Sequence, residues 1–179
     1  MGTIFVAGGY GVGKSSLCEA LSVLLNIPAY SAGDLISQVN GEKYGANKVV
    51  KNKILNQEIL VAEVNERLKE WPTILLAGHF CIFDKMNGVD KLPITVFRRL
   101  QIEQILLLEA DVERIIDNLS KRDGKMYTHE QITALLNVES IAAKQTALEI
   151  NCLFHIHKMA FDETDINTCA SILTGRNIK

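Results

Sequence analysis

The chain has 179 residues and a formal net charge of −2, with 47% hydrophobic and 22% charged residues. This composition can build a sizeable core and is not that of a disordered protein, and the length predicts one domain over residues 1–179. Because the chain has no basic excess or basic block, we expect no nucleic-acid partner and no membrane, whereas a local phosphate site needs few charges.

Short apolar runs alternate with helical patterns along the first part of the chain. The first buried strand is expected at Thr3–Ala7, and an amphipathic helix with leucines on one face follows at Lys14–Asn26. Pro28–Ser31 predicts a second strand, after which a helix opens near Asp34. Residues 40–48 are rich in glycine and asparagine, which favours a loop.

The middle of the chain contains one long helix, one strand and one irregular stretch. The helix is expected from about Val50 to Glu70, where Trp71-Pro72 ends it. Thr73–Ala77 predicts the third strand. We expect the stretch His79–Pro93 to be irregular, with a turn at Asn87-Gly88.

The last part of the chain continues the alternation of strand and helix. Thr128 with Gln131 is typical of a capping box and opens a helix that runs to about Asn151. The other expected elements are strands at Gln104–Leu108 and Leu153–His157 and helices at Asp111–Arg122 and Glu163–Leu173. Five apolar strands separated by helices imply an α/β fold, with a parallel sheet covered by helices on both faces.

The loop between the first strand and the first helix has the spacing GxxxxGK[ST] of a P-loop. Its glycines let the backbone curl so that successive N–H groups point at phosphate oxygens, and the helix N-terminus adds positive potential. Lys14 reaches the β- and γ-phosphates, the Ser15 hydroxyl suits Mg²⁺, and Ser16 lies near the α-phosphate. The candidate nucleotide-binding residues are Gly8, Gly9, Gly11, Val12, Gly13, Lys14, Ser15 and Ser16.

Two other nucleotide motifs are absent from the sequence. A dinucleotide-binding GxGxxG would begin at Gly11, but Ser16 replaces its third glycine and Lys14 would crowd a dinucleotide. The guanine-reading NKxD does not occur, since Asn47-Lys48 is followed by two valines. The P-loop indicates ATP or GTP and leaves the preference open.

From these motifs the sequence resembles the small P-loop kinases of the nucleoside monophosphate kinase group. It is most similar to the archaeal and nuclear adenylate-kinase-like proteins and to related bacterial ATP-binding proteins. The matching pieces are FVAGGYGVGKSSL, YSAGDLI, ILLAGHFCIF and LLEADVERIIDNLSKRDGK, within residues 4–125. The resemblance implies a P-loop NTPase three-layer fold, a five-stranded parallel sheet in the order 2-3-1-4-5, ATP as phosphoryl donor with Mg²⁺, and a short lid near residues 120–128.

The third strand departs from the pattern of that family. Relatives usually end it with Asp, a short residue and His, whereas here it ends Ala77-Gly78-His79. His79 matches the retained histidine, which would lie beside the γ-phosphate, and packing is the alternative. Asp34 either takes over the missing carboxylate's role at Mg²⁺ or at the acceptor, or caps its helix. The rival hypothesis is that chemistry has been lost and nucleotide binding kept.

Basic residues supply the remaining candidates. Arg122 matches the family's lid-entry arginine, which packs on the adenine or touches phosphate, and a solvated arginine at a helix C-terminus is the alternative. Lys125 on the lid is a weaker candidate, and Arg98-Arg99 either meets an acceptor phosphate or is a solvated pair. The predicted catalytic residues are thus Lys14, Asp34, His79 and Arg122, and the predicted metal ligands are Ser15 and Asp34.

Periodicity alone singles out a carboxylate and two histidines. Glu139 falls in the apolar stripe of its helix, so it either lies at an exposed rim or pairs with Arg122 or Lys121 and steadies the lid. His155 and His157 share one face of the last strand, which allows metal binding but is more typical of packing, since no third ligand is evident.

These features predict an enzyme that transfers the γ-phosphoryl of Mg·ATP to a small acceptor, with a nucleoside monophosphate as the leading class. The alternative is a nucleotide-binding ATPase or switch with weak or lost kinase chemistry, read by a protein partner. The chain has four cysteines without metal-ligand spacing, which indicates free thiols. With no apolar run near the ~20 residues of a bilayer span and no signal-peptide pattern, we expect a cytoplasmic location.

Overall fold

The computed structural model describes residues 2–41, 53–84, 88–124 and 126–176. Along the chain the elements are β1 (Thr3–Gly8), α1 (Lys14–Leu25), β2 (Ala29–Ser31), α2 (Ala32–Asn40), α3 (Lys53–Glu70), β3 (Ile74–Ala77), β4 (Cys81–Asp84), β5 (Gly88–Lys91), α4 (Ile94–Arg99), β6 (Ile102–Glu109), α5 (Val112–Asp123), α6 (His129–Ile150), β7 (Leu153–Lys158) and α7 (Thr164–Thr174).

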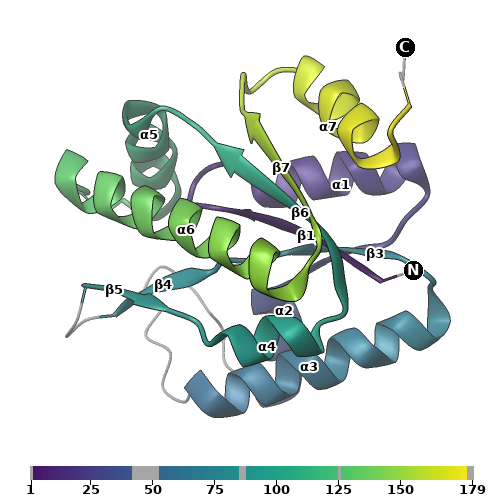
Figure 1. The fold of residues 1–179 in the computed structure, drawn as a ribbon. Coiled ribbons are helices and arrows are strands. Elements are labelled where there is room, and N and C mark those ends of the chain that lie inside the picture. The colour runs from purple at the N-terminus through teal and green to yellow at the C-terminus, as the bar shows by residue number, and fades with distance from the viewer. Residues whose placement is uncertain (1, 42–52, 85–87, 125, 177–179) are drawn as a thin grey trace.

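Five of the strands form one parallel sheet in the order β2-β3-β1-β6-β7. These are the five expected strands in the expected order, so the predicted α/β P-loop fold is confirmed. Helices lie on both faces of the sheet, with α1 packed against α7 on one side and α4 between α3 and α6 on the other (Figure 1).

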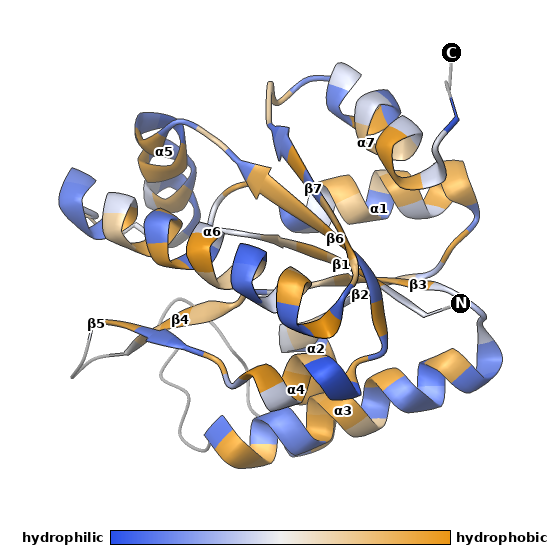
Figure 2. Cartoon of the chain, viewed as in Figure 1, coloured by the Kyte–Doolittle hydropathy of each residue, from blue (hydrophilic) through white to orange (hydrophobic). Residues whose placement is uncertain are grey.

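The core alternates along each central strand because successive side chains point to opposite faces. In β1, Ile4 and Val6 join the cluster beneath α1 and α7, whereas Phe5 and Ala7 join the cluster beneath α3 and α4. Figure 2 shows β6 as largely apolar, whereas α3 and α6 alternate apolar and polar residues along their length. A strand apolar on both faces is typical of a parallel sheet covered on both sides.

The expectation that His79–Pro93 is irregular is wrong, because β4 and β5 form an antiparallel hairpin there. Cys81 and Phe83, two residues apart, both pack against the core, and α6 covers the hairpin. An alternation of only two apolar residues is too short to stand out in a sequence. Gly88 begins β5 with a positive φ of 77°, and its expected turn partner Asn87 lies outside the described residues.

Helix ends are close to the expected ones, with one correction. Ser31 is the N-cap of α2 and accepts a hydrogen bond from the Asp34 N–H at 3.4 Å, so the interpretation of Asp34 as the cap is wrong. The capping box of Thr128 and Gln131 at the start of α6 is confirmed. The helix start at Val50, most of the loop at 40–48, and Lys125 lie outside the described residues.

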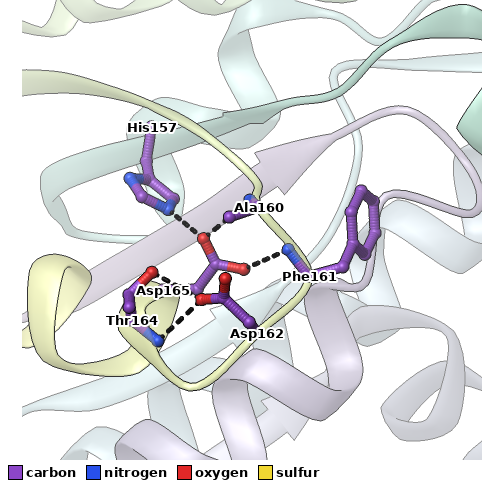
Figure 3. A network of polar contacts seen from close by, with 6 residues as sticks. All are labelled: His157, Ala160, Phe161, Asp162, Thr164 and Asp165. Carbon is purple, nitrogen blue, oxygen red and sulfur yellow. Dashed lines mark hydrogen bonds and ion pairs between the residues drawn. The ribbon is translucent and has the colours of Figure 1, made fainter.

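The turn between β7 and α7 is held by one buried carboxylate (Figure 3). Asp165 is 2% exposed and accepts hydrogen bonds from the N–H groups of Ala160 at 2.9 Å and Phe161 at 2.7 Å. Its Oδ1 also lies 2.7 Å from His157 Nε2, so this histidine packs as a partner of Asp165. His155 Nε2 is buried without a hydrogen-bond partner among the described residues, which contain no group of three or more His, Cys, Asp or Glu able to hold a metal.

Among the described residues, no helix has both the length and the apolar character needed to cross a membrane.

Asp165→Asn is expected to lower the free energy of unfolding by about 2–3 kcal/mol, because it weakens charge-assisted hydrogen bonds to a buried group. Burial opposes ionisation of Asp165, but the bonds from Ala160, His157 and Phe161 outweigh it and hold the pKa of this carboxyl below its usual range. Its contribution is therefore present above the unfolded-state pKa of about 4 and lost as the pH falls through the lower folded-state value. Urea unfolding from pH 3 to 7 measures this, with Glu163→Gln, at an exposed position of the same turn without a side-chain cap hydrogen bond, as control. Equal losses in the two variants would contradict the account.

Candidate functional site

The carboxyl ends of β1, β2 and β3 meet at one edge of the sheet. Ala77, the last residue of β3, pairs with Ser31 of β2 and Val6 of β1, so the segments that follow these strands emerge side by side. A cavity of about 520 Å³ opens there. It is lined on one side by the P-loop, on another by Ala32 and Gly33, and on a third by the residues that follow β3. Crevices at this edge are where open α/β sheets bind ligands.

The P-loop has the backbone conformation that its glycines allow. Gly11 and Gly13 have positive φ values of 81° and 95°, a region that side chains disfavour. A Cβ at Gly11 would also lie 2.9 Å from Leu119 Cγ, so this position has no room for a side chain. Gly13 is the N-cap of α1 and offers no side-chain cap, which leaves the first-turn N–H groups directed at the cavity edge. This arrangement fits phosphate oxygens.

The side chain of Lys14 folds back onto the P-loop and bonds its carbonyl oxygens. It is 9% exposed, and its Nζ donates hydrogen bonds of 2.8 Å to the carbonyl oxygens of Gly8 and Gly9. Both bonds are with neutral acceptors. A phosphate oxygen in the cavity would offer Lys14 a charged acceptor, and charge-assisted hydrogen bonds are roughly twice as strong as neutral ones.

Two side chains join the P-loop to its neighbours. The Tyr10 ring packs against the His79 ring at a tilt of 35° with centroids 4.0 Å apart, and it stacks on Phe83 of β4 at 5.6 Å. Burial raises the pKa of Tyr10 above its ordinary value, so the phenol is neutral at physiological pH. On the other side, Asn118 of α5 donates from Nδ2 to the Gly11 carbonyl at 2.9 Å. The sequence analysis did not identify either residue, because both occupy positions that the motifs leave unspecified.

Most of the predicted site residues line the cavity, and a few do not. Three residues of the P-loop itself, Gly8, Gly9 and Val12, are buried and do not line the cavity. Asp34 has an exposed side chain in the first turn of α2 and is also absent from the lining, although its neighbours Ala32 and Gly33 contribute. The predicted residues that line the cavity are Gly11, Gly13, Lys14, Ser15, Ser16, His79 and Arg122.

The end of α5 supplies basic groups at the cavity mouth. Lys121 and Arg122 both line the cavity, and Lys121 bonds Asp117 one turn earlier at 2.7 Å. The interpretation of Glu139 as a residue at an exposed rim is wrong, because its side chain is 1% exposed. Its carboxylate accepts hydrogen bonds from backbone N–H groups, which reduce the cost of burying it.

The side of the cavity opposite the P-loop is largely apolar, with a few polar groups. Lys53 bonds Asp90 of β5 at 2.6 Å, and Asn40 donates to the buried Asn56 at 3.0 Å. Gln57 is a further polar lining residue, and the apolar ones are Phe5, Ile36, Leu60, Ile82, Leu92, Val96, Phe97 and Leu100. Few polar groups on an apolar wall are typical of a small-molecule pocket.

Arg98 and Arg99 do not contribute to this cavity. Arg98 lies 3.6 Å from Glu149 of α6, and Arg99 forms a two-pronged pair with Glu58 of α3 at 2.5 and 2.8 Å. Both are exposed on α4, so the interpretation of a solvated pair is correct and the interpretation as an acceptor-phosphate site is wrong.

The residues present fit a nucleotide better than they fit a metal ion alone. The exposed hydroxyl of Ser15 faces the cavity, but no carboxylate among the described residues lines it. Mg²⁺ is usually bound through one or two carboxylates together with substrate phosphates and water. Ser15 and the phosphates of a nucleotide would therefore hold the ion, with Asp34 as the nearest carboxylate along α2 that could act through water.

The four cysteines are free thiols, as expected. Burial raises the pKa of Cys18 and of Cys169 to about 12, so both stay protonated. They act as small apolar side chains in the core.

Together, the parallel sheet, the P-loop and the cavity define a P-loop protein with a kinase-like fold. Residues 7–135 match the family described as an AAA domain, and since this is more than half of the chain, the chain belongs to that family. A comparison with curated proteins finds no matching sequence.

Solved structures share the fold at low sequence identity. Shikimate kinase from Acinetobacter baumannii, in complex with shikimate, matches with a TM-score of 0.64 at 14% identity, covering 100% of this chain and 96% of its own. Deoxyadenosine kinase from M. mycoides, with products bound, matches with a TM-score of 0.61 at 14% identity, covering 97% and 100%. A gluconokinase from Sinorhizobium meliloti 1021 matches with a TM-score of 0.52 at 14% identity, covering 97% and 96%.

Gly11→Ala is expected to destabilise the protein more than Gly41→Ala. Both glycines have a positive φ, 81° and 69°, where an L-residue is disfavoured by roughly 1–2 kcal/mol. Only the Gly11 substitution also forces a methyl group against Leu119, because a Cβ at Gly41 meets no atom of the described residues within 4 Å. Thermal unfolding of the two variants measures the difference. Equal losses would mean that the P-loop is not as closely packed against α5 as the structure indicates.

Proposed function

We propose that this protein transfers the γ-phosphoryl group of ATP, with Mg²⁺, to a small acceptor molecule. The observation that carries the proposal is the placement of a complete P-loop at one wall of a cavity whose opposite wall is apolar with a few polar groups. A donor nucleotide at the first wall and an acceptor at the second would meet beside His79. The fold that this chain shares with small-molecule kinases supports the same arrangement.

Catalysis would consist mainly of positioning and charge neutralisation. The P-loop N–H groups and Lys14 would bind the donor phosphates, and Ser15 would hold the metal ion. Arg122 and Lys121 at the end of α5 would approach the same phosphates from the cavity mouth, as a lid over residues 120–128 would require. His79, or Asp34 through water, would lie near the acceptor hydroxyl or phosphate.

A nucleoside monophosphate remains the leading acceptor class from the sequence resemblance. The names of the structural relatives widen the test, because they include kinases of shikimate, gluconate and deoxyadenosine. In the described part of the chain, the acceptor wall offers Lys53, Asn56 and Gln57 as polar groups. These groups suit hydroxyls and amides as well as an anion.

One observation favours a second candidate function, a nucleotide-binding ATPase or switch read by a protein partner. Ala77 ends β3 and lines the cavity. The adenylate-kinase-like proteins that the sequence resembles usually carry Asp at this position. Without that carboxylate the metal ion would have fewer protein ligands. The protein would then bind the nucleotide but transfer its phosphoryl group slowly.

Incubation with γ-labelled ATP and a panel of nucleoside monophosphates, deoxynucleosides, shikimate and gluconate tests the kinase proposal. We expect stoichiometric labelled product with one acceptor class. Lys14→Ala should lower this turnover by roughly 100-fold or more, because it removes the cation that contacts the transferred group. Lys144→Ala, exposed on α6, is the matched control and should leave turnover unchanged. Slow hydrolysis that no acceptor alters would instead support the switch.

Ala77→Asp and Asp34→Ala decide which carboxylate serves the metal ion. If Asp34 has taken over the role, Asp34→Ala lowers the turnover of ATP by roughly 10-fold or more and Ala77→Asp restores it in the same chain. Gln38→Ala, exposed on the same helix, is the control. A wild-type protein without turnover that gains it through Ala77→Asp alone would show that the chemistry has been lost and binding kept.

A further inference from the structure

The buried carboxylate of Glu139 on α6 accepts hydrogen bonds from the P-loop and from the segment after β3. Its Oε1 accepts from the Gly8 N–H at 3.3 Å and from the Phe80 N–H at 3.0 Å. Its Oε2 accepts from the N–H groups of Phe80 at 3.0 Å and Cys81 at 2.9 Å and from the Cys81 thiol at 2.9 Å. All of these contacts are donors, so a carboxylate fits the position better than any neutral side chain.

The donors come from two segments that the sequence separates widely. Gly8 is the last residue of β1 and the first glycine of the P-loop, whereas Phe80 and Cys81 follow β3. Between β3 and these amides lies His79, whose ring lines the cavity. The carboxylate therefore connects the start of the donor loop with the segment that carries His79.

A second contact joins the same two segments from the side chains. The Tyr10 ring of the P-loop packs against the His79 ring with centroids 4.0 Å apart, so the ring of His79 is placed by its own backbone and by the loop together. Burial raises the pKa of Glu139 above its ordinary range, whereas the bonds from Cys81 and Phe80 and the ammonium of Lys14 oppose this effect. Gly8 is bonded through both of its backbone groups. Its carbonyl accepts from Lys14, and its N–H donates to Glu139.

We propose that Glu139 is a positioning residue that fixes the P-loop and the His79 segment relative to each other, so that the donor phosphates and His79 stay aligned for transfer. Glu139 does not line the cavity and acts through the backbone of Gly8, Phe80 and Cys81. The inference rests on the proposed function for its kinetic consequence, and the anchoring itself can be tested without turnover.

Glu139→Gln tests the proposal, because it keeps the size and shape of the side chain and replaces one acceptor oxygen by an NH₂ group. In one orientation of the amide its NH₂ group faces the N–H of Gly8, and in the other it faces the N–H of Cys81. In both cases two donors face each other and at least one hydrogen bond is lost. Glu149→Gln, at an exposed position of the same helix, is the matched substitution control. Ile132→Val, buried on α6 one to two turns earlier, controls for a loss of stability of about 0.5–1.5 kcal/mol.

Amide hydrogen exchange by NMR gives the first measurement. In Glu139→Gln we expect the amides of Gly8, Phe80 and Cys81 to exchange roughly tenfold faster or more, while interior amides of β1 and β3 remain protected. The two control variants should not show this local change. Unchanged exchange at the three amides, or a uniform increase over the whole sheet, would overturn the anchoring.

ATP turnover and ATP affinity give the second measurement. We expect kcat to fall by roughly 10- to 100-fold while the Kd for Mg·ATP changes by less than about threefold, since misalignment affects transfer more than binding. In a His79→Ala background, Glu139→Gln should cause little further loss, because both changes disturb the same group. An unchanged kcat, a loss confined to Kd, or additive losses would overturn the proposal. Wild-type protein without any ATP turnover would instead refute the proposed function, and amide exchange would still decide the anchoring.

Discussion

The carboxylate of Glu139 lies where the ends of β1 and β3 meet α6. The hydrogen bonds that it accepts there position two walls of the cavity, the P-loop and the segment after β3. Three backbone N–H groups and one thiol donate hydrogen bonds to it. A buried carboxylate without these donors would be strongly unfavourable. These hydrogen bonds therefore favour one relative position of the P-loop and the residues after β3.

The cavity has two chemically different walls as a consequence of the sheet order. Because β1 is central, its P-loop lies between α5, which carries Arg122, and the segment after β3, which carries His79. The opposite wall comes from α3 and α4, whose buried side chains include Leu60, Val96 and Phe97 and are mostly apolar. Charge is concentrated at one wall, so a nearly neutral overall charge is compatible with the proposed binding of a polyphosphate.

The short apolar strands separated by helices predict a parallel sheet covered on both faces. The order of its strands is implied by the resemblance to small P-loop kinases, and the structure has that order. The sequence does not predict the hairpin of β4 and β5, whose alternation is too short. It also misplaces Glu139, because periodicity locates a residue on a helix face but cannot identify backbone donors more than 50 residues away in sequence, such as those of Phe80 and Cys81. Contacts of this kind appear only when the chain is folded.

A ¹⁵N NMR titration of the wild-type protein with Mg·ATP tests whether the cavity beside the P-loop is a nucleotide site. We expect saturable shifts that are largest at Gly11, Gly13 and the first turn of α1, with smaller ones at His79. Shifts that are absent, or that concentrate on the far side of the sheet around α7, would contradict this expectation.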